Sequence, residues 1–423
     1  MTAREVLAVP AMGAGFAALL ALAELLRRRR GWAPETSRKL VHAGGGLLAL
    51  AIPAVFTSPV PVLALGAGCS IALAAARRWG GLRAVHAVER RTSGSEYYPL
   101  AVALLFVVSE GQSWLFTPSV LVLAVADAFA ALIGSRFGRR RYRVEDEEKS
   151  LEGSLAFLAI AGPAIWLPLR LLTTLPAGAA AMSALLVAAL VTGFEAVSLR
   201  GSDNLFVPIG VCVILAKITA QPTAEIAYQL ASFALILLLG GGIAWRTRSF
   251  NVGGALTVLL FCYGVWSLAD ERWAAAALAG FVAYALARRL VPARVEWERP
   301  VRVRIVFRTV SVPFLIVVLA NTYRMTPRLG GVFGATIAAA LAQSLWNHAV
   351  QAAPAAARRR ALFAVLSLAA LAAPLALLEE PKNIAWGALG AALAVQVNAA
   401  VRRRRGAAPE VWGALQMALT LLA

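Results

Sequence analysis

Residues 123–157, LAVADAFAALIGSRFGRRRYRVEDEEKSLEGSLAF, say most about the fold and hold the most informative polar residues of the chain. It begins in an apolar run that contains one carboxylate, Asp127. It then crosses a strongly charged segment and returns to apolar sequence after Lys149–Ser154. A charged side chain inside a membrane helix is costly and is usually functional. The stretch therefore predicts two membrane helices whose polar residues meet at one membrane face.

The composition extends this interpretation to the whole chain. Of the 423 residues, 60% are hydrophobic, and the mean hydropathy is +0.72, well above that of soluble globular proteins. Several apolar runs reach the roughly 18 residues that a helix needs to cross the hydrocarbon core. The alternating pattern of a membrane β-barrel does not occur. We therefore expect an all-α, polytopic integral membrane protein.

The charge distribution predicts how the chain crosses the membrane. The apolar runs indicate about sixteen transmembrane helices, and arginine and lysine gather in alternate connections. The positive-inside rule places those connections in the cytoplasm of a bacterial-type inner or plasma membrane. We interpret the net charge of +19 as topology and as attraction for anionic lipid, not as a sign of nucleic acid binding. Residues 5–26 precede the Arg27–Arg30 block, so they predict a retained first helix with its N-terminus outside.

The polar motifs divide the chain into two halves, residues 1–222 and residues 223–423. The polar motifs of the first half all fall on the cytoplasmic side of the predicted topology. The second half carries mostly arginines in its connections. The three cysteines have no metal-binding spacing. We expect one site in the first half, where a soluble nucleotide and a membrane-borne lipid meet.

Asp127 is the first candidate site residue. From the middle of a membrane helix, its short side chain does not reach far toward the interface. Mg²⁺ takes one or two protein carboxylates and fills its remaining positions with phosphate oxygens and water, so Asp127 is a candidate magnesium ligand. Gly134 follows on the same helix face, where a backbone or a nucleotide could approach closely.

The segment from Lys149 to Ser154 is the second candidate. Ser150 is the expected N-cap of the next helix. A lysine, hydroxyl groups and a glycine at a helix N-terminus favour phosphate. We therefore predict a phosphate-binding segment formed by Lys149, Ser150, Glu152, Gly153 and Ser154. The chain has neither a P-loop nor the kinase glycine-rich loop motif, and we expect residues 136–148 to form a solvated loop.

Three further motifs are individually ambiguous. Each has a plain structural interpretation: a basic flank with a packed histidine and the glycines Gly44–Gly46 for close helix approach, an interfacial aromatic belt, or a helix cap. Each also has a functional one, in which basic side chains hold phosphate and carboxylates bind metal or accept a proton. The phosphate candidates are Arg38, Lys39, His42, Arg91 and Asn204. The second metal candidate is Asp203 or Glu195, and the candidate proton acceptors are Glu195, Asp203 and His42.

Taken in order, these motifs resemble the CTP-dependent lipid-alcohol kinases, a membrane family that includes dolichol kinase, phytol kinase and the CTP-dependent diacylglycerol kinase. The resemblance covers about residues 20–220. It is most specific at Asp127 with Gly134 and at Lys149–Ser154, while Ala126 stands where the family often has glycine. It implies a phosphotransferase that uses Mg²⁺ to move a phosphoryl group from CTP, or another nucleotide, to phytol, dolichol or a polyprenol.

The second half faintly resembles the phytyl-phosphate kinase family, around Arg308, Leu319–Asn321 and Leu329–Gly334. That family has Ala-Asp-Thr where this chain has Ala342-Gln343-Ser344. The loss of the acid puts a second metal-dependent activity in doubt and suggests a degenerate or repurposed partner domain. Two alternatives remain for the whole chain. A cytidylyltransferase that makes a CDP-lipid would carry a His-Gly-Gly-x-x-Asp-Arg signature, which is absent. A transporter would show an inverted repeat, and the two halves do not share their motifs.

Overall fold

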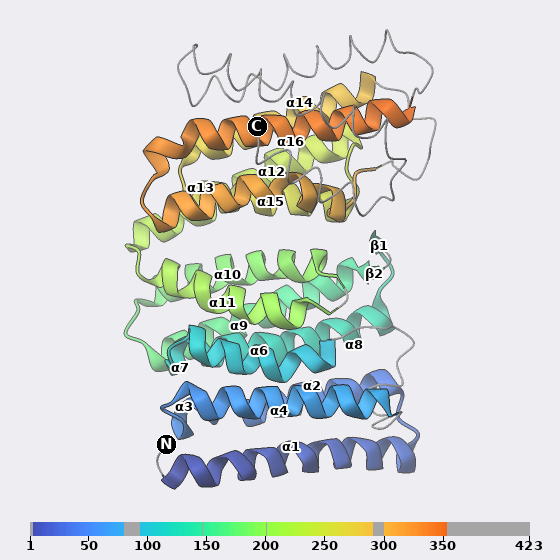
Figure 1. Cartoon of the computed structure of the whole chain (residues 1–423), viewed down its shortest axis with the longest axis vertical. Helices are drawn as coiled ribbons and strands as arrows, with labels where there is room; N and C mark the ends of the chain where they lie inside the picture. Colours follow the sequence, from blue (N-terminus) through green and yellow to red (C-terminus); the bar gives the residue numbers. More distant parts are fainter. Residues whose placement is uncertain (1–2, 80–93, 146, 200, 291–299, 353–423) are drawn as a thin grey trace. The chain divides into compact units, whose positions relative to one another are not determined.

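The computed structural model describes residues 3–79, 94–145, 147–199, 201–290 and 300–352, and these are almost entirely helical (Figure 1). The chain divides into two compact units, Met1–Leu230 and Ala231–Ala423. The division falls inside helix α12 (Thr223–Thr247). The boundary that we expected between residues 222 and 223 lies just before the same helix.

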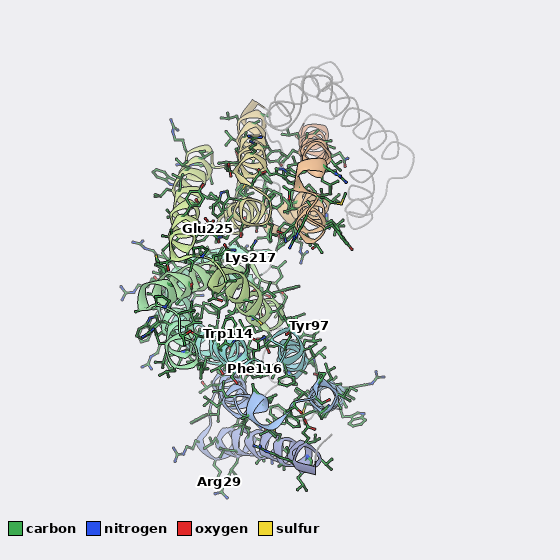
Figure 2. The ribbon with its side chains drawn as sticks, turned by 90° about the vertical axis from the view of Figure 1, so that its left-hand side faces the viewer. Arg29, Tyr97, Trp114, Phe116, Lys217 and Glu225 are labelled. Atoms are coloured by element: carbon green, nitrogen blue, oxygen red, sulfur yellow. The ribbon has the colours of Figure 1, made fainter. Side chains whose placement is uncertain are left out.

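The first unit is a stack of helices that run alongside one another (Figure 1). Its helices are α1 (Ala3–Arg30), α2 (Pro34–Ala49), α3 (Ile52–Val55), α4 (Pro59–Arg78), α6 (Gly94–Val108), α7 (Ser113–Leu121), α8 (Asp127–Phe137), α9 (Leu151–Leu172), α10 (Ala177–Val197) and α11 (Asp203–Thr219). Phe116 lies between the helices of this unit (Figure 2), fully buried, and meets the ring of Phe106 edge-on with 6.1 Å between centroids. The core is therefore formed by the apolar faces of helices.

The second unit contains α13 (Val252–Leu268), α14 (Glu271–Leu290), α15 (Val303–Thr322) and α16 (Thr326–Ala352). Its core is mainly aliphatic and includes several aromatic side chains, and the rings of Trp273 and Phe333 stack with 4.7 Å between centroids. Gln343 is fully buried in α16, and its amide has no hydrogen-bond partner within the described ranges. Ser344 is hydrogen bonded to Tyr284 at 3.0 Å.

Seven helices in the described part of the chain are long and apolar enough to cross a membrane. They are Arg4–Arg30, Pro59–Arg78, Ser113–Phe137, Leu151–Leu172, Ala177–Val197, Thr223–Arg246 and Val303–Thr322. The protein is therefore an all-α membrane protein, as expected, although the expected number of about sixteen spans is not confirmed. The apolar runs before residue 353 coincide largely with helices, and the spans predicted after residue 352 lie outside the described residues.

A π-helical turn, Val122–Ala126, interrupts the long helix between α7 and α8 and ends directly before Asp127. Such turns are rare, and they are frequent at functional sites. Residue composition does not indicate this turn, so the sequence does not predict it. The position of the π-helical turn singles out Asp127 as a candidate site residue, independently of the charge of Asp127.

A β-hairpin joins α8 to α9 where we expected a solvated loop. Strand β1 (Arg141–Val144) pairs with β2 (Glu147–Ser150) in an antiparallel register that sets Arg141 opposite Ser150. The hydroxyl groups of Tyr142 and Ser154 are hydrogen bonded at 2.8 Å and tie the hairpin to the first turn of α9. The hairpin lies at the end of the unit where α8 stops and α9 begins (Figure 1).

Candidate functional site

A cavity of about 670 Å³ lies at the same end of the first unit. The first turns of α2, α6, α9 and α11 contribute to its wall, together with α8, the end of α10 and the hairpin. Amide groups at helix N-termini carry partial positive charge and favour anions. Most of the predicted site residues line this cavity: Arg38, Lys39, Asp127, Gly134, Lys149, Ser150, Gly153, Ser154, Glu195, Asp203 and Asn204.

Asp127 receives two side chains from α2 at the base of this cavity. The ammonium group of Lys39 lies 2.6 Å from the Asp127 carboxylate, and the His42 ring nitrogen Nε2 lies 3.1 Å from the same oxygen. Lys39 is 4% exposed, so this ion pair is almost fully removed from solvent. Lys39 and His42 point the same way because residues three apart share a helix face. The arrangement fixes the position of the carboxylate.

The hydrogen bonds of His42 define which of its atoms carries hydrogen. Nε2 lies 2.9 Å from the carbonyl oxygen of Leu123. A carbonyl oxygen can only accept, so Nε2 must donate its hydrogen. His42 is therefore not a proton acceptor at this nitrogen. The Tyr98 hydroxyl donates to the His42 carbonyl oxygen at 2.9 Å, and the two rings are 4.3 Å apart.

Gly46 lets α2 come close enough for these contacts. A β-carbon added at Gly46 would lie 2.2 Å from the β-carbon of Ala124 and 2.7 Å from the Tyr98 hydroxyl. No side chain fits in that space. The expectation that the glycines after His42 allow close helix approach is confirmed at this position.

Lys149 forms a second buried ion pair on the other side of the cavity. Its ammonium group donates to the Glu195 carboxylate at 2.9 Å, to the Ser198 hydroxyl at 3.0 Å and to the Glu195 backbone carbonyl. Burial lowers the pKa of Lys149, but the negative charges of Glu195 and Asp203 and the hydrogen bond to Glu195 together outweigh it and raise the pKa above its ordinary value. Lys149 is therefore a fixed positive charge at neutral pH.

The predicted phosphate-binding segment is formed where α8 and α9 meet. Ser150 is the N-cap of α9, as expected, and its hydroxyl accepts from the Gly153 amide at 3.1 Å. A β-carbon added at Gly153 would lie 3.2 Å from the α-carbon of Gly134, so both glycines permit close packing of the helices. Glu152 does not line the cavity. It accepts from the Arg140 amide at 3.1 Å and so holds the base of the hairpin.

Asp203 and Asn204 lie in the first turn of α11 and have different partners. Asn204 donates to the carbonyl oxygen of Gly94 at 2.9 Å and joins α11 to α6. The Oδ1 atom of Asp203 is buried and has no hydrogen-bond partner among the described residues. Burial, and next the negative charge of the nearby Asp127, raise the pKa of the Asp203 carboxyl well above its usual range. Arg91 lies outside the described residues.

The carboxylates in the cavity are sufficient for a magnesium site. In the described ranges no group of three or more histidine, cysteine, aspartate or glutamate side chains could hold a metal by itself. Mg²⁺ needs only one or two protein carboxylates when phosphate oxygens complete its coordination. Asp127 and Asp203 line one cavity, and the unpaired Asp203 oxygen is a suitable metal ligand.

Fold and cavity together define an integral membrane protein with a deep polar site, rich in both cations and carboxylates, at one end of its helices. No family model and no solved structure matches the chain. Phytol kinase from Synechocystis sp. (strain ATCC 27184 / PCC 6803 / Kazusa) is 31% identical to it over 217 residues, which cover 47% of this chain and 85% of that protein. The chain therefore belongs to the family of membrane lipid-alcohol kinases that includes this phytol kinase.

Proposed function

We propose that the protein transfers the γ-phosphoryl group of CTP, or of another nucleoside triphosphate, to the hydroxyl group of a prenol-type alcohol such as phytol, dolichol or a polyprenol. One observation supports this most strongly. This chain is related to a lipid-alcohol kinase, and one of its cavities brings together Arg38, Lys39 and Lys149 with Asp127 and Asp203. Phosphoryl transfer depends mainly on positioning and charge neutralisation, and this set of side chains supplies both.

In this proposal the phosphates lie between Lys149 and the first turn of α9. Lys149 is held by Glu195 and keeps its charge, while the Ser150 cap orders the amides of the first turn. Amides at a helix N-terminus and a lysine ammonium group both bind phosphate oxygens. Arg38 adds a further cation, and it is itself held by Glu35 at 2.6 Å.

Asp127 and Asp203 are the residues that would hold Mg²⁺. The metal, when bound, supplies positive charge that offsets the charge of the transferring phosphoryl group. Lys39 and His42 orient the Asp127 carboxylate from α2, and Gly46 lets them reach it. We therefore assign Lys39 and His42 to positioning Asp127.

Asp203 is the best candidate to accept the proton of the alcohol. The Nε2 atom of His42 donates to Leu123, and Glu195 is paired with Lys149. The Oδ1 atom of Asp203 is buried and has no hydrogen-bond partner within the described residues, so it is free to accept. An unpaired carboxylate oxygen suits both a metal ligand and a proton acceptor, and the magnesium dependence of an Asp203→Asn variant separates the two roles.

The cavity faces the cytoplasm in this proposal, because the basic connections of the chain predict that side to be cytoplasmic. A soluble nucleotide then reaches the phosphate end, and the lipid alcohol arrives from the membrane.

The test is incubation of membranes containing the protein with Mg²⁺, labelled CTP or ATP, and separately phytol, geranylgeraniol, undecaprenol or diacylglycerol. We expect label from the γ position to enter a prenol product, and label from the α position to stay in the nucleotide. Transfer of the α label into the lipid would show a cytidylyltransferase instead. No transfer of either label to any alcohol would contradict the proposal.

A further inference from the structure

Ser198 is the C-terminal capping residue of α10 and is not one of the predicted site residues. Its hydroxyl group accepts a hydrogen bond from the Lys149 ammonium group at 3.0 Å and donates one to the Glu195 carbonyl oxygen at 2.8 Å. Lys149 and Glu195 line the charged cavity, whereas Ser198 does not. Ser198 therefore holds the ammonium group from behind the cavity wall.

The hydrogen bonds of Lys149 occupy all of its donors. An ammonium group has three N–H groups and no acceptor. The last turn of α10 supplies three acceptors to Lys149: the carboxylate of Glu195, the backbone carbonyl oxygen of Glu195 and the hydroxyl group of Ser198. Direct binding of a phosphate oxygen by Lys149 therefore requires the release of one of these three acceptors.

Ser198 is the acceptor that Lys149 can release at the lowest cost. Glu195 attracts the ammonium group with a full negative charge, and a hydrogen bond to a charged acceptor is stronger than one to a neutral hydroxyl group. When Lys149 leaves, the Ser198 hydroxyl group keeps its own hydrogen bond to the Glu195 carbonyl oxygen. The release therefore leaves no buried donor without a partner, and such a donor would be costly.

We propose that Ser198 is a positioning residue that holds one N–H group of Lys149 in the empty site and gives it up to a phosphate oxygen of the nucleotide. The inference rests on the proposed kinase function and adds how the phosphate-binding lysine changes partners. Lys149 keeps its pairing with Glu195 in both states, so the exchange does not separate the two charges. A phosphate oxygen is a stronger acceptor than the hydroxyl group that it replaces.

The exchange predicts that Ser198→Ala improves phosphate binding. In the empty site the variant loses the hydrogen bond from Lys149, whereas in the phosphate-bound site that bond is already broken. The hydrogen bond from Ser198 to the Glu195 carbonyl oxygen is lost in both states, so its effect on binding cancels. The variant should therefore bind phosphate about fivefold more tightly, which corresponds to a hydrogen bond of about 1 kcal/mol.

The first test is a thermal-shift titration of the whole detergent-solubilised chain with tripolyphosphate and Mg²⁺. We expect the dissociation constant to be about fivefold lower for Ser198→Ala than for wild type, and unchanged for Ser198→Thr, which keeps the hydroxyl group. Thr192→Val is the matched control, because the Thr192 hydroxyl group lies on the same helix and donates to the Ala188 carbonyl oxygen at 2.7 Å. An unchanged or higher dissociation constant for Ser198→Ala would overturn the inference.

The second test distinguishes the exchange at Lys149 from a general loosening of the fold. A Lys149→Met background has no ammonium group to hold, so Ser198→Ala should leave the dissociation constant for tripolyphosphate unchanged there. An equal gain in both backgrounds would overturn the inference, because additive effects mean that the two side chains do not interact. Ser198→Cys, which has a weaker acceptor, replaces Ser198→Ala if that variant does not fold, and it should also bind more tightly than wild type.

These outcomes are distinct from a failure of the kinase proposal, because the titration contains no alcohol. If wild type transfers γ-label to a prenol while Ser198→Ala binds tripolyphosphate no more tightly, the kinase proposal stands and the role of Ser198 is wrong. If wild type transfers no label but the variants bind in the predicted order, the kinase proposal fails and the exchange at Lys149 stands. Absence of tripolyphosphate binding to wild type would contradict both.

Discussion

The ion pair between Lys39 and Asp127 provides the sharpest test of how the cavity is held together. We consider Lys39→Met, which keeps the length of the apolar stem and removes the charge. In the variant, the Asp127 carboxylate loses the ammonium group at 2.6 Å and keeps the neutral His42 contact at 3.1 Å. A carboxylate that is only 15% exposed is then left without its counter-charge.

Removing one partner of a buried ion pair typically costs about 3–5 kcal/mol, because the remaining charge is uncompensated. For a unit of this size, each kcal/mol lowers the melting temperature by roughly 2–4 °C, so Lys39→Met should melt about 6–20 °C below wild type. The double variant Lys39→Met with Asp127→Asn removes both charges and should recover much of that loss.

The assay is thermal unfolding of detergent-solubilised protein, followed by fluorescence-detected size-exclusion chromatography. Arg28→Met is the matched control, because Arg28 pairs with Glu24 at 2.8 Å but is 71% exposed. An exposed pair contributes at most about 1 kcal/mol, so the control should stay close to wild type. The reasoning is refuted if Lys39→Met lowers the melting temperature equally in the wild-type and Asp127→Asn backgrounds, since additive effects mean that the charges do not interact.

Three further predictions follow from the same contacts. Gly46→Ala should lose about 1–3 kcal/mol of stability through overpacking. Gly68→Ala is the control, because Gly68 faces open space on α4 and its substitution should cost no stability. The melting temperatures of the two variants test this difference. Tyr98→Phe removes one buried hydrogen bond to His42 and should lose about 0.5–1.5 kcal/mol in the same assay. The folded-state pKa of Lys149 is raised, so its stabilising contribution persists below about pH 10.4 and is lost as the pH rises further. Between pH 9 and pH 11.5, the melting temperature of wild type should therefore fall more than that of Lys149→Met. Equal falls would contradict the assignment of Lys149 as a buried, paired cation.

Local sequence signals were enough to predict the helices of the first unit and part of the site. Ser150 was predicted as an N-cap from its position before an apolar run, and its hydroxyl makes that bond. Gly46 was predicted to allow close packing, and the contact with Ala124 requires it. The cap depends on a neighbouring residue, and the close approach depends on the missing side chain of the glycine itself, so a single sequence carries both signals.

Long-range pairing and backbone irregularity could not be predicted in the same way. Lys39 and Asp127 are 88 residues apart, and both were predicted to serve the site without any sign that they bind each other. No characteristic residue pattern marks the π-helical turn before Asp127 in the sequence. The charge-rich segment after α8 was interpreted as a loop because its residues are polar, yet strand pairing depends on the register between Arg141 and Ser150.

Glu152 shows the limit of assigning a role from a motif alone. It lies between Ser150 and Gly153, which both line the cavity, but its side chain turns to the Arg140 amide. Successive residues at a helix start point in different directions. The direction in which each side chain of such a segment points is therefore known only from the three-dimensional structure.

The central claim is that the Asp127 cavity performs phosphoryl transfer to a lipid alcohol. Its most direct test is the rate of γ-phosphate transfer from CTP to a prenol in membranes containing equal amounts of wild type, Asp127→Asn, or the exposed control Glu110→Gln. Removing one essential electrostatic group typically costs about 10²–10³ in rate, so Asp127→Asn should fall by at least about 100-fold while Glu110→Gln transfers phosphate like wild type. Wild-type transfer by a correctly inserted Asp127→Asn variant would contradict the account.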